Sequence, residues 1–285
     1  MKRDEFRFLD RLRVRWAEID AQKIVFNGHY LMYFDTAVAG YWRALALPYP
    51  QTVEGLAGDL YVRKATVEYL GSARYDDVLD VGIRCARIGS SSMTFAAGVF
   101  RQDELLVSGE LVYVFADPVT QTAKAVPPEL RAVFQGFEAG EPMIDIRVGG
   151  WTELGAAAKA IRTAVFTQEQ QVPLAMGWDD ADAGAVHALA RNRLGLPLAT
   201  GRLLEQSPGV ARIGRMAVIP ALRGSGVGRA VLDALLDAAR DRGDREALLH
   251  AQTSAAGFYV RAGFSARGPI FEDAGITHVE MLRDL

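Results

Sequence analysis

The sequence predicts two unlike domains, an α+β domain followed by a mixed α/β domain. In the first half, one long segment with helical periodicity is followed by several strand-like segments joined by turns. In the second half, strand-like and helical segments alternate along the chain. A length of 285 residues fits about two domains. Because no internal repeat relates the halves, we expect two separate folds.

Composition and charge exclude several classes of protein. Hydrophobic residues make up 50% of the chain and charged residues 24%, as in ordinary soluble globular proteins. The net charge of −3 gives no overall basic field that would favour nucleic acid or an anionic membrane. The opening MKRDEFRFLDRLRVRW alternates charged and apolar residues, unlike a signal peptide, and no apolar run approaches the ~20 residues of a membrane span. We expect a cytoplasmic protein without nucleic-acid or membrane partners.

The first half predicts a sheet wrapped around a helix. A strand over 6–16 and a loop over 17–28 lead into a helix whose apolar positions recur at three- and four-residue spacing: Tyr30, Leu31, Phe34, Ala37, Val38, Tyr41, Trp42 and Leu45. Pro48 and Pro50 end it. Strands are expected over 61–69, 78–88, 93–101 and 105–115, joined by turns that suit an antiparallel meander.

The strand over 78–88 has one face on a core. Leu79, Val81, Ile83 and Cys85 point one way, and Asp80, Gly82 and Arg84 point the other way. Cys85 is the single cysteine, so we expect a buried core thiol. The four histidines, His29, His187, His250 and His278, lack metal-ligand spacing, so we expect no metal.

The second half begins after EAGEP (138–142), a sequence typical of linkers, which follows a short closing helix over 127–137. We expect a helix over 155–170, a hairpin of 186–190 with 198–205, and a strand over 211–219. A helix over 227–240 stops at Gly243, with a buried stripe of Val227, Ala230, Val231, Ala234, Leu235 and Ala238. A strand over 247–252, a short helix over 255–262 and a strand over 276–282 follow. The predicted domains are 1–138 and 146–285.

The stretch PALRGSGVGRAVLDALL (220–236) predicts a glycine-rich turn between a strand and a helix. Glycines let backbone N–H groups approach a ligand, and the first turn of a helix offers free donors to an anion such as pyrophosphate. Arg223 and Arg229 add positive charge. The dinucleotide fingerprint fails because Arg229 replaces its third glycine, and the P-loop lysine is absent. A tight turn that only packs a helix closely is the alternative.

This turn resembles the acyl-CoA-binding turn of GNAT-family N-acetyltransferases, which has the pattern Arg-x-x-Gly-x-Gly. GRMAVIPALRGSGVG is similar to that family's central strand and turn, and AAGFYVRAGF to its FYxxxGF helix. VFTQEQQVPLAMGWDDAD resembles a bacterial subgroup of the family. The resemblance covers about residues 146–285.

The resemblance implies roles for particular residues. The backbone of Met216, Ala217 and Val218 pairs with the acyl carbonyl and pantetheine arm, and the pyrophosphate binds the N–H groups of Arg223, Gly224, Ser225, Gly226, Val227, Gly228 and Arg229. An amine attacks the thioester, and Tyr259 is the general acid or else a packed aromatic. No general base is evident, and His187 and His250 remain candidates. Glu169, Asp179 and Asp182 bind a cationic acceptor or relay its proton, or are solvated surface carboxylates.

The stretch VRWAEIDAQKIVFNGHYLMYFDTA (14–37) places Asp20 in a loop before a helix, with Asn27 at the expected N-cap. The helix end can polarise a carbonyl oxygen, and the carboxylate can attack the carbon or activate a water. Alternatively, Asp20 only caps a turn and Asn27 only caps the helix. Glu18 is a second carboxylate, which we expect at the surface.

The same stretch is similar to the signature Asp-x-x-Gly-x-Val-x-Asn-x-x-Tyr of the 4-hydroxybenzoyl-CoA thioesterase-like hotdog family. Asp20, Val25, Asn27 and Tyr30 match it, and Lys23 replaces the glycine. The resemblance covers about residues 6–137. It implies that Asp20 is the catalytic carboxylate, that N–H groups near Asn27 and Gly28 form the oxyanion site, and that Tyr30 lines the pocket or packs as an aromatic.

Together the resemblances imply a bifunctional acyl-CoA enzyme, a thioesterase fused to an N-acetyltransferase. Acetyl-CoA or another acyl-CoA is the substrate, a small amine is the acceptor, and no cofactor is tightly bound. Hotdog domains place the active site between subunits, so a homo-oligomer, dimer or tetramer, is expected through this domain. The alternatives are an acyl-CoA-binding regulatory protein, or a hotdog dimerisation module that carries an active acetyltransferase.

Overall fold

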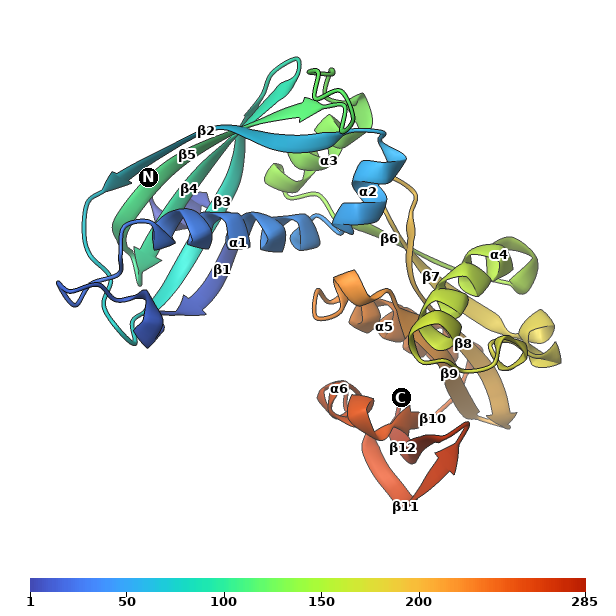
Figure 1. Cartoon of the computed structure of the whole chain (residues 1–285). Coiled ribbons are helices and arrows are strands. Elements are labelled where there is room, and N and C mark those ends of the chain that lie inside the picture. The colour runs from blue at the N-terminus through green and yellow to red at the C-terminus, as the bar shows by residue number, and fades with distance from the viewer. The chain divides into compact units, whose positions relative to one another are not determined.

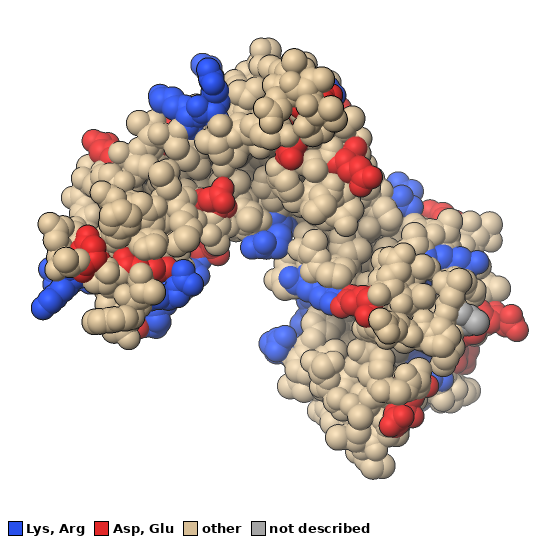
Figure 2. Space-filling model, in the orientation of Figure 1, with Lys and Arg blue, Asp and Glu red and all other residues tan. Residues whose placement is uncertain are grey.

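A computed structural model describes residues 1–285, apart from the side chain of Ala175. The chain forms two compact units, Met1–Met143 and Ile144–Leu285, each built around its own sheet (Figure 1). On the face drawn in Figure 2, basic and acidic residues are interspersed over both units, in keeping with the net charge of −3. None of the helices in the described residues is both long enough and apolar enough to cross a membrane.

The first unit contains a five-stranded antiparallel sheet in the order β1-β3-β4-β5-β2. The strands are β1 (Phe8–Arg13), β2 (Asp59–Tyr69), β3 (Val78–Ile88), β4 (Ser92–Arg101) and β5 (Glu104–Ala116). Strands β3, β4 and β5 are neighbours in the sheet, as the predicted meander requires. Strands β1 and β2 form the two edges of the sheet.

Helix α1 (His29–Ala44) lies against this sheet (Figure 1) and buries most of the predicted apolar stripe. Leu31 was expected in the stripe but is 42% exposed. Tyr33 is buried instead, because its hydroxyl donates a hydrogen bond to Glu18 at 2.8 Å. Pro50 does not follow the helix as a breaker but lies in the first turn of α2 (Tyr49–Gly55), which was not predicted. Helix α3 (Pro128–Glu138) closes the unit as expected.

Strand β3 is buried on both faces near its start, contrary to the prediction of one exposed face. Asp80 is covered because Arg3 and Arg11 both donate to its carboxylate, at 2.7 and 2.8 Å. Gly82 is covered by the ring of Phe6, which leaves no room for a side chain. Cys85 is partly buried, and desolvation raises the pKa of its thiol to about 12. The thiol is therefore protonated at neutral pH and is a poor nucleophile.

The second unit contains a seven-stranded sheet in the order β11-β12-β10-β9-β8-β7-β6. Its strands are β6 (Ile144–Gly149), β7 (Val186–Asn192), β8 (Pro197–Ser207), β9 (Val210–Val218), β10 (Glu246–Gln252), β11 (Ser265–Asp273) and β12 (Ile276–Asp284). The β9–β10 pair is parallel and every other pair is antiparallel. The unpredicted strands β6 and β11 are the edges, and β11 is almost wholly exposed, so it lacks the apolar alternation that marks a strand.

The helices of the second unit are α4 (Trp151–Arg162), α5 (Val227–Arg242) and α6 (Ala256–Arg261). Helix α4 begins before the expected residue 155 and continues as a π-helical turn, Thr163–Glu169. Helix α5 ends at Gly243, which has a φ of +91°, as predicted. Its buried residues are Val227, Val231, Leu232, Leu235, Leu236 and Ala239, whereas Ala230, Ala234 and Ala238 of the expected stripe are only half-buried.

Candidate active sites

The central strands of the second unit part from each other. Strands β9 and β10 pair only from Val210–Glu246 to Ile213–Leu249, although both continue for several residues. Beyond this point the edge of β9 that faces β10 has no strand partner. Met216, Ala217 and Val218 lie in this stretch, and β9 keeps its pairing with β8 there through Ala217 and Val218. An extended ligand can therefore lie between the two strands and bind the free backbone groups.

A β-bulge marks the place where the strands part. Arg215 has a φ of +52°, and the pairing of β8 with β9 shifts by one residue between Thr200–Ala217 and Arg202–Gly214. Opposite the bulge, a Cβ on Gly201 would lie 2.4 Å from the Met216 sulfur. The bulge therefore redirects the side chains of β9 at the point where β9 and β10 part.

The glycine turn follows β9 directly. Gly224 and Gly226 have φ values of +81° and +90°, which side chains other than glycine rarely adopt. The first backbone hydrogen bond of α5 runs from the Ala230 N–H to the Gly226 carbonyl at 3.0 Å. The N–H groups of Val227, Gly228 and Arg229 precede it and have no acceptor within the helix. Free N–H groups at the positive end of a helix dipole are donors of the kind that bind anions.

Both arginines of the turn already have partners. Arg223 makes two hydrogen bonds of 2.6 Å to the carboxylate of Glu169, and this pairing lowers the pKa of Glu169. Arg229 donates to Asp233 at 2.8 Å and to the Arg261 carbonyl at 3.1 Å. Glu169 therefore lies beside the glycine turn. The backbone N–H groups, rather than the guanidinium groups, are therefore the donors of the turn that lack a partner among the described residues.

A cavity of about 440 Å³ opens where β9 and β10 part. Tyr259, on α6, lines this cavity and is nearly buried, and desolvation raises its pKa to about 12, so the phenol is protonated at neutral pH. Its ring also packs on Phe258 and Phe264. His250, on β10, lines the same cavity, with its Nε2 3.7 Å from Glu280. The structure thus brings a protonated phenol and an imidazole into one cavity.

Asp179 lines the cavity, whereas Asp182 lies behind it and is fully buried. Asp182 accepts hydrogen bonds at 3.0 Å from both Arg162 and Arg202. Burial disfavours its charge, but these bonds outweigh burial and hold its pKa below the usual range. Asp182 cannot bind an acceptor from solvent, and the expectation of a solvated surface carboxylate is wrong for this residue. Asp179 accepts from Arg202 at 2.5 Å and from Arg215 at 3.0 Å, so its charge is paired as well.

His187 is also buried and does not line the cavity, so it is not available as a general base. Its Nε2 donates to the Asp182 carbonyl at 2.9 Å, while Nδ1 lies 3.3 Å from the Arg162 guanidinium. Nδ1 must accept there, which requires a neutral ring. Burial, together with the Arg162 charge, lowers the pKa of His187 accordingly.

In the first unit, the loop that carries Asp20 is folded back on itself before α1. The Asp20 N–H bonds the Ile24 carbonyl at 2.9 Å, and the Asp20 carboxylate accepts from the Gln22 N–H at 2.8 Å. Lys23 replaces the glycine of the hotdog signature but has a φ of +63°, within the left-handed region that favours glycine. The loop therefore adopts a glycine-like turn even without the glycine.

Helix α1 begins at His29, with Gly28 rather than Asn27 as the N-cap and no side-chain capping bond. The expectation of an Asn27 cap is therefore wrong. Asn27 and Gly28 are exposed, and their N–H groups have no hydrogen-bond acceptor among the described residues. The Asn27 carbonyl accepts from the Tyr69 hydroxyl at 3.2 Å, which fixes the peptide. The free N–H groups suit a carbonyl oxygen that becomes negative.

Tyr30 and Glu18 are both buried in the structure. Tyr30 is buried, accepts a hydrogen bond from the Ala73 N–H at 3.1 Å, and packs between two other tyrosines, so it is a packed aromatic. Glu18 is buried as well, contrary to the expectation of a surface residue. Burial disfavours the charged carboxylate, but hydrogen bonds outweigh burial and lower the pKa of Glu18. These hydrogen bonds come from the Arg15 N–H, the Tyr33 hydroxyl and the Arg15 guanidinium. The spacing of residues in the sequence did not indicate that Arg15 and Tyr33 would bond Glu18.

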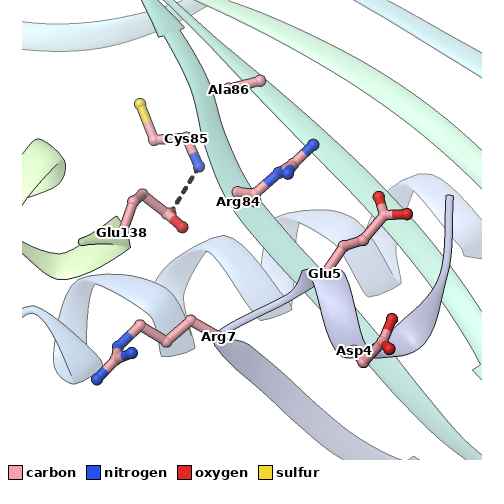
Figure 3. Close-up of a pocket in the computed structure, with 7 residues that line it drawn as sticks. All are labelled: Asp4, Glu5, Arg7, Arg84, Cys85, Ala86 and Glu138. Carbon is pink, nitrogen blue, oxygen red and sulfur yellow. Dashed lines mark hydrogen bonds between the residues drawn. The ribbon is translucent and has the colours of Figure 1, made fainter. Parts of the chain in front are cut away.

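A second cavity, of about 520 Å³, lies at the other end of β3 (Figure 3). It is lined by Asp4, Glu5, Arg7, Arg84, Cys85, Ala86 and Glu138, and the Cys85 N–H donates to Glu138 at 2.9 Å. The loop with Asp20 adjoins the start of β3, where the Val14 N–H bonds the Asp77 carbonyl. At about 3.3 Å per residue, Cys85 lies roughly 25 Å along the strand from Asp77. This cavity is therefore separate from the Asp20 loop.

The fold and the sites define the class of each unit. Parted parallel strands with a bulge and a glycine turn are the architecture of an acyl-CoA-dependent transferase, and a helix against a curved antiparallel sheet is that of a hotdog thioesterase. A family model described as acetyltransferase (GNAT) domain matches residues 156–285. A model described as thioesterase superfamily matches residues 22–108. Among the described side chains, no three His, Cys, Asp or Glu residues are grouped so that they could hold a metal ion.

Individual relatives agree with the family models. An uncharacterized N-acetyltransferase, YjcF, from Bacillus subtilis is 33% identical over 44% of this chain and 88% of its own. A putative esterase from Aquifex aeolicus is 31% identical over 34% of this chain and 74% of its own. The acyl-CoA thioester hydrolase YbgC from Escherichia coli is 26% identical over 44% of this chain and 92% of its own. The chain therefore belongs to the thioesterase superfamily through its first unit and to the GNAT acetyltransferase family through its second.

Proposed function

We propose that one chain catalyses two reactions of acyl-CoA thioesters at separate sites. The domain 1–138 hydrolyses an acyl-CoA to a carboxylic acid and free CoA, and the domain 146–285 transfers an acetyl or other acyl group from CoA to an amine. The observation that carries the proposal is that β9 and β10 part beside a glycine turn whose helix N–H groups are unpaired. The thioester can lie between the strands while its pyrophosphate binds the turn.

For hydrolysis, the thioester carbonyl oxygen accepts hydrogen bonds from the N–H groups of Asn27 and Gly28, where α1 begins. Asp20 either attacks the carbonyl carbon or removes a proton from an attacking water. The tetrahedral intermediate then expels the CoA thiolate. When water is the nucleophile this leaves the carboxylic acid, and when Asp20 is the nucleophile it leaves an acyl-Asp20 anhydride that a water molecule hydrolyses to the acid and free Asp20. The Asx-type bond between Asp20 and the Gln22 N–H supports this role, because it holds the carboxylate at one place in the loop.

For acyl transfer, a neutral amine attacks the thioester carbonyl carbon, and the C–S bond breaks as the new C–N bond forms. The backbone of Met216, Ala217 and Val218 holds the acyl carbonyl and the pantetheine arm. Tyr259 donates to the leaving sulfur, and His250 takes the proton that the amine loses. The position of both side chains on one cavity supports this pair of roles.

A homodimer or tetramer through the first unit is part of the proposal. Strand β2 is an edge strand with exposed apolar residues, among them Val62 at 55% exposure and Tyr69 at 50%. A long unpaired edge of this kind favours pairing with a second sheet. Tyr69, on this edge, bonds the Asn27 carbonyl, so a two-fold partner paired with β2 would lie near the start of α1.

Thiol release tests the proposal. With acetyl-CoA and longer acyl-CoAs but no amine, Asp20→Asn should reduce the release of free CoA at least about 1,000-fold, because the catalytic carboxylate is lost. Asp103→Asn, at an exposed turn where no hydrogen bond or ion pair to the Asp103 side chain is found among the described residues, should leave the rate unchanged. An Asp20→Asn variant that hydrolyses at the wild-type rate would remove Asp20 from the mechanism. Tight acyl-CoA binding without thiol release, with or without amines, would instead support a regulatory binding protein.

A further inference from the structure

The acceptor cavity of the second unit has a surplus of positive charge, and this surplus identifies the chemical class of the acceptor. We propose that the amine acceptor also carries a carboxylate, as an amino acid does, and that Arg212 and Arg215 bind this carboxylate. The inference rests on the proposed acyl transfer at the parted strands β9 and β10. It reverses the expectation that Glu169, Asp179 and Asp182 bind a cationic acceptor.

The buried charges behind the cavity do not balance. Three arginines, Arg162, Arg202 and Arg215, share two carboxylates, Asp179 and Asp182. Arg162 is fully buried and Arg202 is 7% exposed, so water screens this cluster poorly. Both carboxylates are ionised, since hydrogen bonds from the arginines hold their pKa values low. The adjacent His187 is neutral and adds no charge, so one guanidinium lacks a counter-charge.

The unbalanced positive charge of the arginines faces the cavity. Arg202, Arg212 and Arg215 all line it, against the carboxylates of Asp179 and Asp273. Asp179 bridges Arg202 and Arg215, so it orients guanidinium groups and does not present a free negative charge. Arg212 is exposed, and no hydrogen bond or ion pair to its side chain is found in the described part of the chain. Arg212 and Arg215 therefore retain donors for an anion.

The bulge in β9 explains why both arginines reach the cavity. In a regular strand, Arg212 and Arg215 are three residues apart and point to opposite faces. The extra residue at the bulge, where Arg215 has a φ of +52°, shifts the alternation and returns Arg215 to the face of Arg212. Two forked guanidinium groups on one face bind a carboxylate with good geometry.

The chemistry of the reaction agrees with a positive cavity. A cationic diamine would bring further positive charge to unbalanced arginines, which is unfavourable at low dielectric. An amine held beside these arginines has a lowered pKa, because like charge disfavours the ammonium form, and only the neutral amine is a nucleophile. Phe166, Met176 and Trp178 supply apolar walls for the rest of the acceptor. A cavity of about 440 Å³ has room for a molecule of amino-acid size.

Matched pairs of amines test the inference on the full-length protein. Each pair differs only by a carboxylate: phenylalanine with phenethylamine, leucine with isoamylamine, and lysine with cadaverine. Acetyl transfer is followed by mass detection of the N-acetyl product, and kcat/KM is compared within each pair. Binding of N-acetylphenylalanine and N-acetylphenethylamine is measured by calorimetry in parallel. We expect the carboxylate-bearing member to be preferred about tenfold or more in kcat/KM, as for a charge-assisted contact.

Two arginine variants locate the effect. Arg212→Gln and Arg215→Gln should raise the KM for the carboxylate-bearing acceptor about tenfold or more and change the KM for its partner amine less than about twofold. Arg212→Gln is the cleaner variant, because Arg215 also contacts Asp179. Arg240→Gln, on the exposed side of α5 where Arg240 contacts Asp237, is the matched control and should change neither KM. The KM for acetyl-CoA should stay constant in all three variants.

Different results would contradict the carboxylate-bearing acceptor and the transferase function itself. Equal use of both members of each pair, a preference for the amines without a carboxylate, or no binding of either N-acetyl compound overturns the inference. Acetyl transfer to cadaverine in preference to lysine overturns it while leaving acyl transfer intact. Failure of acetyl-CoA to bind the protein at all overturns the proposed transferase function, and the inference falls with it.

Discussion

The raised pKa of Tyr259 limits how readily this side chain can give up its proton. Full proton transfer from a phenol of pKa about 12 to a thiolate is uphill, because a thiol is the stronger acid of the two. In the proposed acyl transfer, Tyr259 would therefore donate a hydrogen bond to the departing sulfur rather than give up its proton outright. The amine loses a proton in the same reaction, and that proton can protonate the thiolate in a later step.

Tyr259→Phe should lower kcat for acetyl transfer about 100-fold, because the hydrogen bond to sulfur forms only as the C–S bond breaks. The KM for acetyl-CoA should change less than about twofold. Steady-state kinetics with a saturating acceptor measures both. Tyr113→Phe, which changes a buried tyrosine of the first unit, is the control. A raised KM with an unchanged kcat would make Tyr259 a packing residue.

His187 makes the second unit sensitive to acid. Its pKa is lowered in the folded state below the ordinary 6.5, so the unfolded chain takes up the proton first as the pH falls. The stabilising contribution of the neutral ring is complete above pH 6.5 and is lost progressively below it. Asp179 and Asp182 titrate at lower pH, because their pKa values are lowered as well. The first acid-induced loss of stability should therefore come from the histidine.

Calorimetric unfolding at about pH 7.5 and about pH 5.5 checks this expectation. The melting temperature of the wild-type second unit should fall between these values, and His187→Gln, which cannot be protonated, should reduce the fall. His278→Gln is the control, since His278 is only partly buried. An equal fall in the wild type and His187→Gln would contradict the assignment of acid sensitivity to His187.

Among the structural elements, the turn before α5 allows a test in which the strain that a substitution adds is distinguished from its effect on ligand binding. Gly226 and Gly243 have almost the same left-handed conformation, with φ values of +90° and +91°. A Cβ would meet no atom within 4 Å at either position. Alanine therefore adds about the same strain at both, on the order of 1 kcal/mol. The two glycines differ in that Gly226 precedes the free N–H groups of α5 and Gly243 follows the end of the helix.

Gly226→Ala should weaken acetyl-CoA binding about tenfold or more, because relief of strain moves the N–H groups away from the pyrophosphate. Gly243→Ala should cost similar stability and leave acetyl-CoA binding unchanged. Titration calorimetry measures the affinity, and thermal unfolding measures the shared loss of stability. Equal affinities in the two variants would mean that the turn serves only to pack the helix.

Much of both folds was predictable from local pattern. The strands of the first sheet are apolar segments bounded by turn residues, and the glycine turn has a distinctive spacing, so both were predicted close to their observed bounds. Long-range pairing was not predictable. Glu18 and Asp182 were expected at the surface because nothing local announces that Tyr33 or Arg162 will reach them. The arginines of the acceptor cavity were missed because strict alternation places Arg212 and Arg215 on opposite faces, and only the bulge reunites them.

For the whole molecule, the proposed pairing of two copies would make the activity of the first unit depend on the oligomeric state. The exposed edge β2 is where a second copy would extend the sheet. Val62→Lys should prevent this pairing, because a charged side chain on an edge strand opposes further strand addition. The molar mass by light scattering should fall to that of one chain, and thioester hydrolysis should fall with it. Acetyl transfer should persist.

Val119→Lys is the matched control for this experiment. Val119 is 88% exposed and lies in the turn after β5, outside any strand, so the same change should alter neither mass nor hydrolysis. A Val62→Lys protein that keeps the wild-type mass would show that β2 is not the contact between copies. A monomer with full hydrolytic activity would show that the site is complete within one chain.

We expect each unit of the chain to bind an acyl-CoA thioester at its own site. Titration calorimetry with a non-hydrolysable thioether analogue of acetyl-CoA tests it most directly. The wild type should show two binding sites per chain, of which Gly226→Ala weakens one and Asp20→Asn weakens neither by much. A single site per chain, or two sites that both respond to Gly226→Ala, would contradict it.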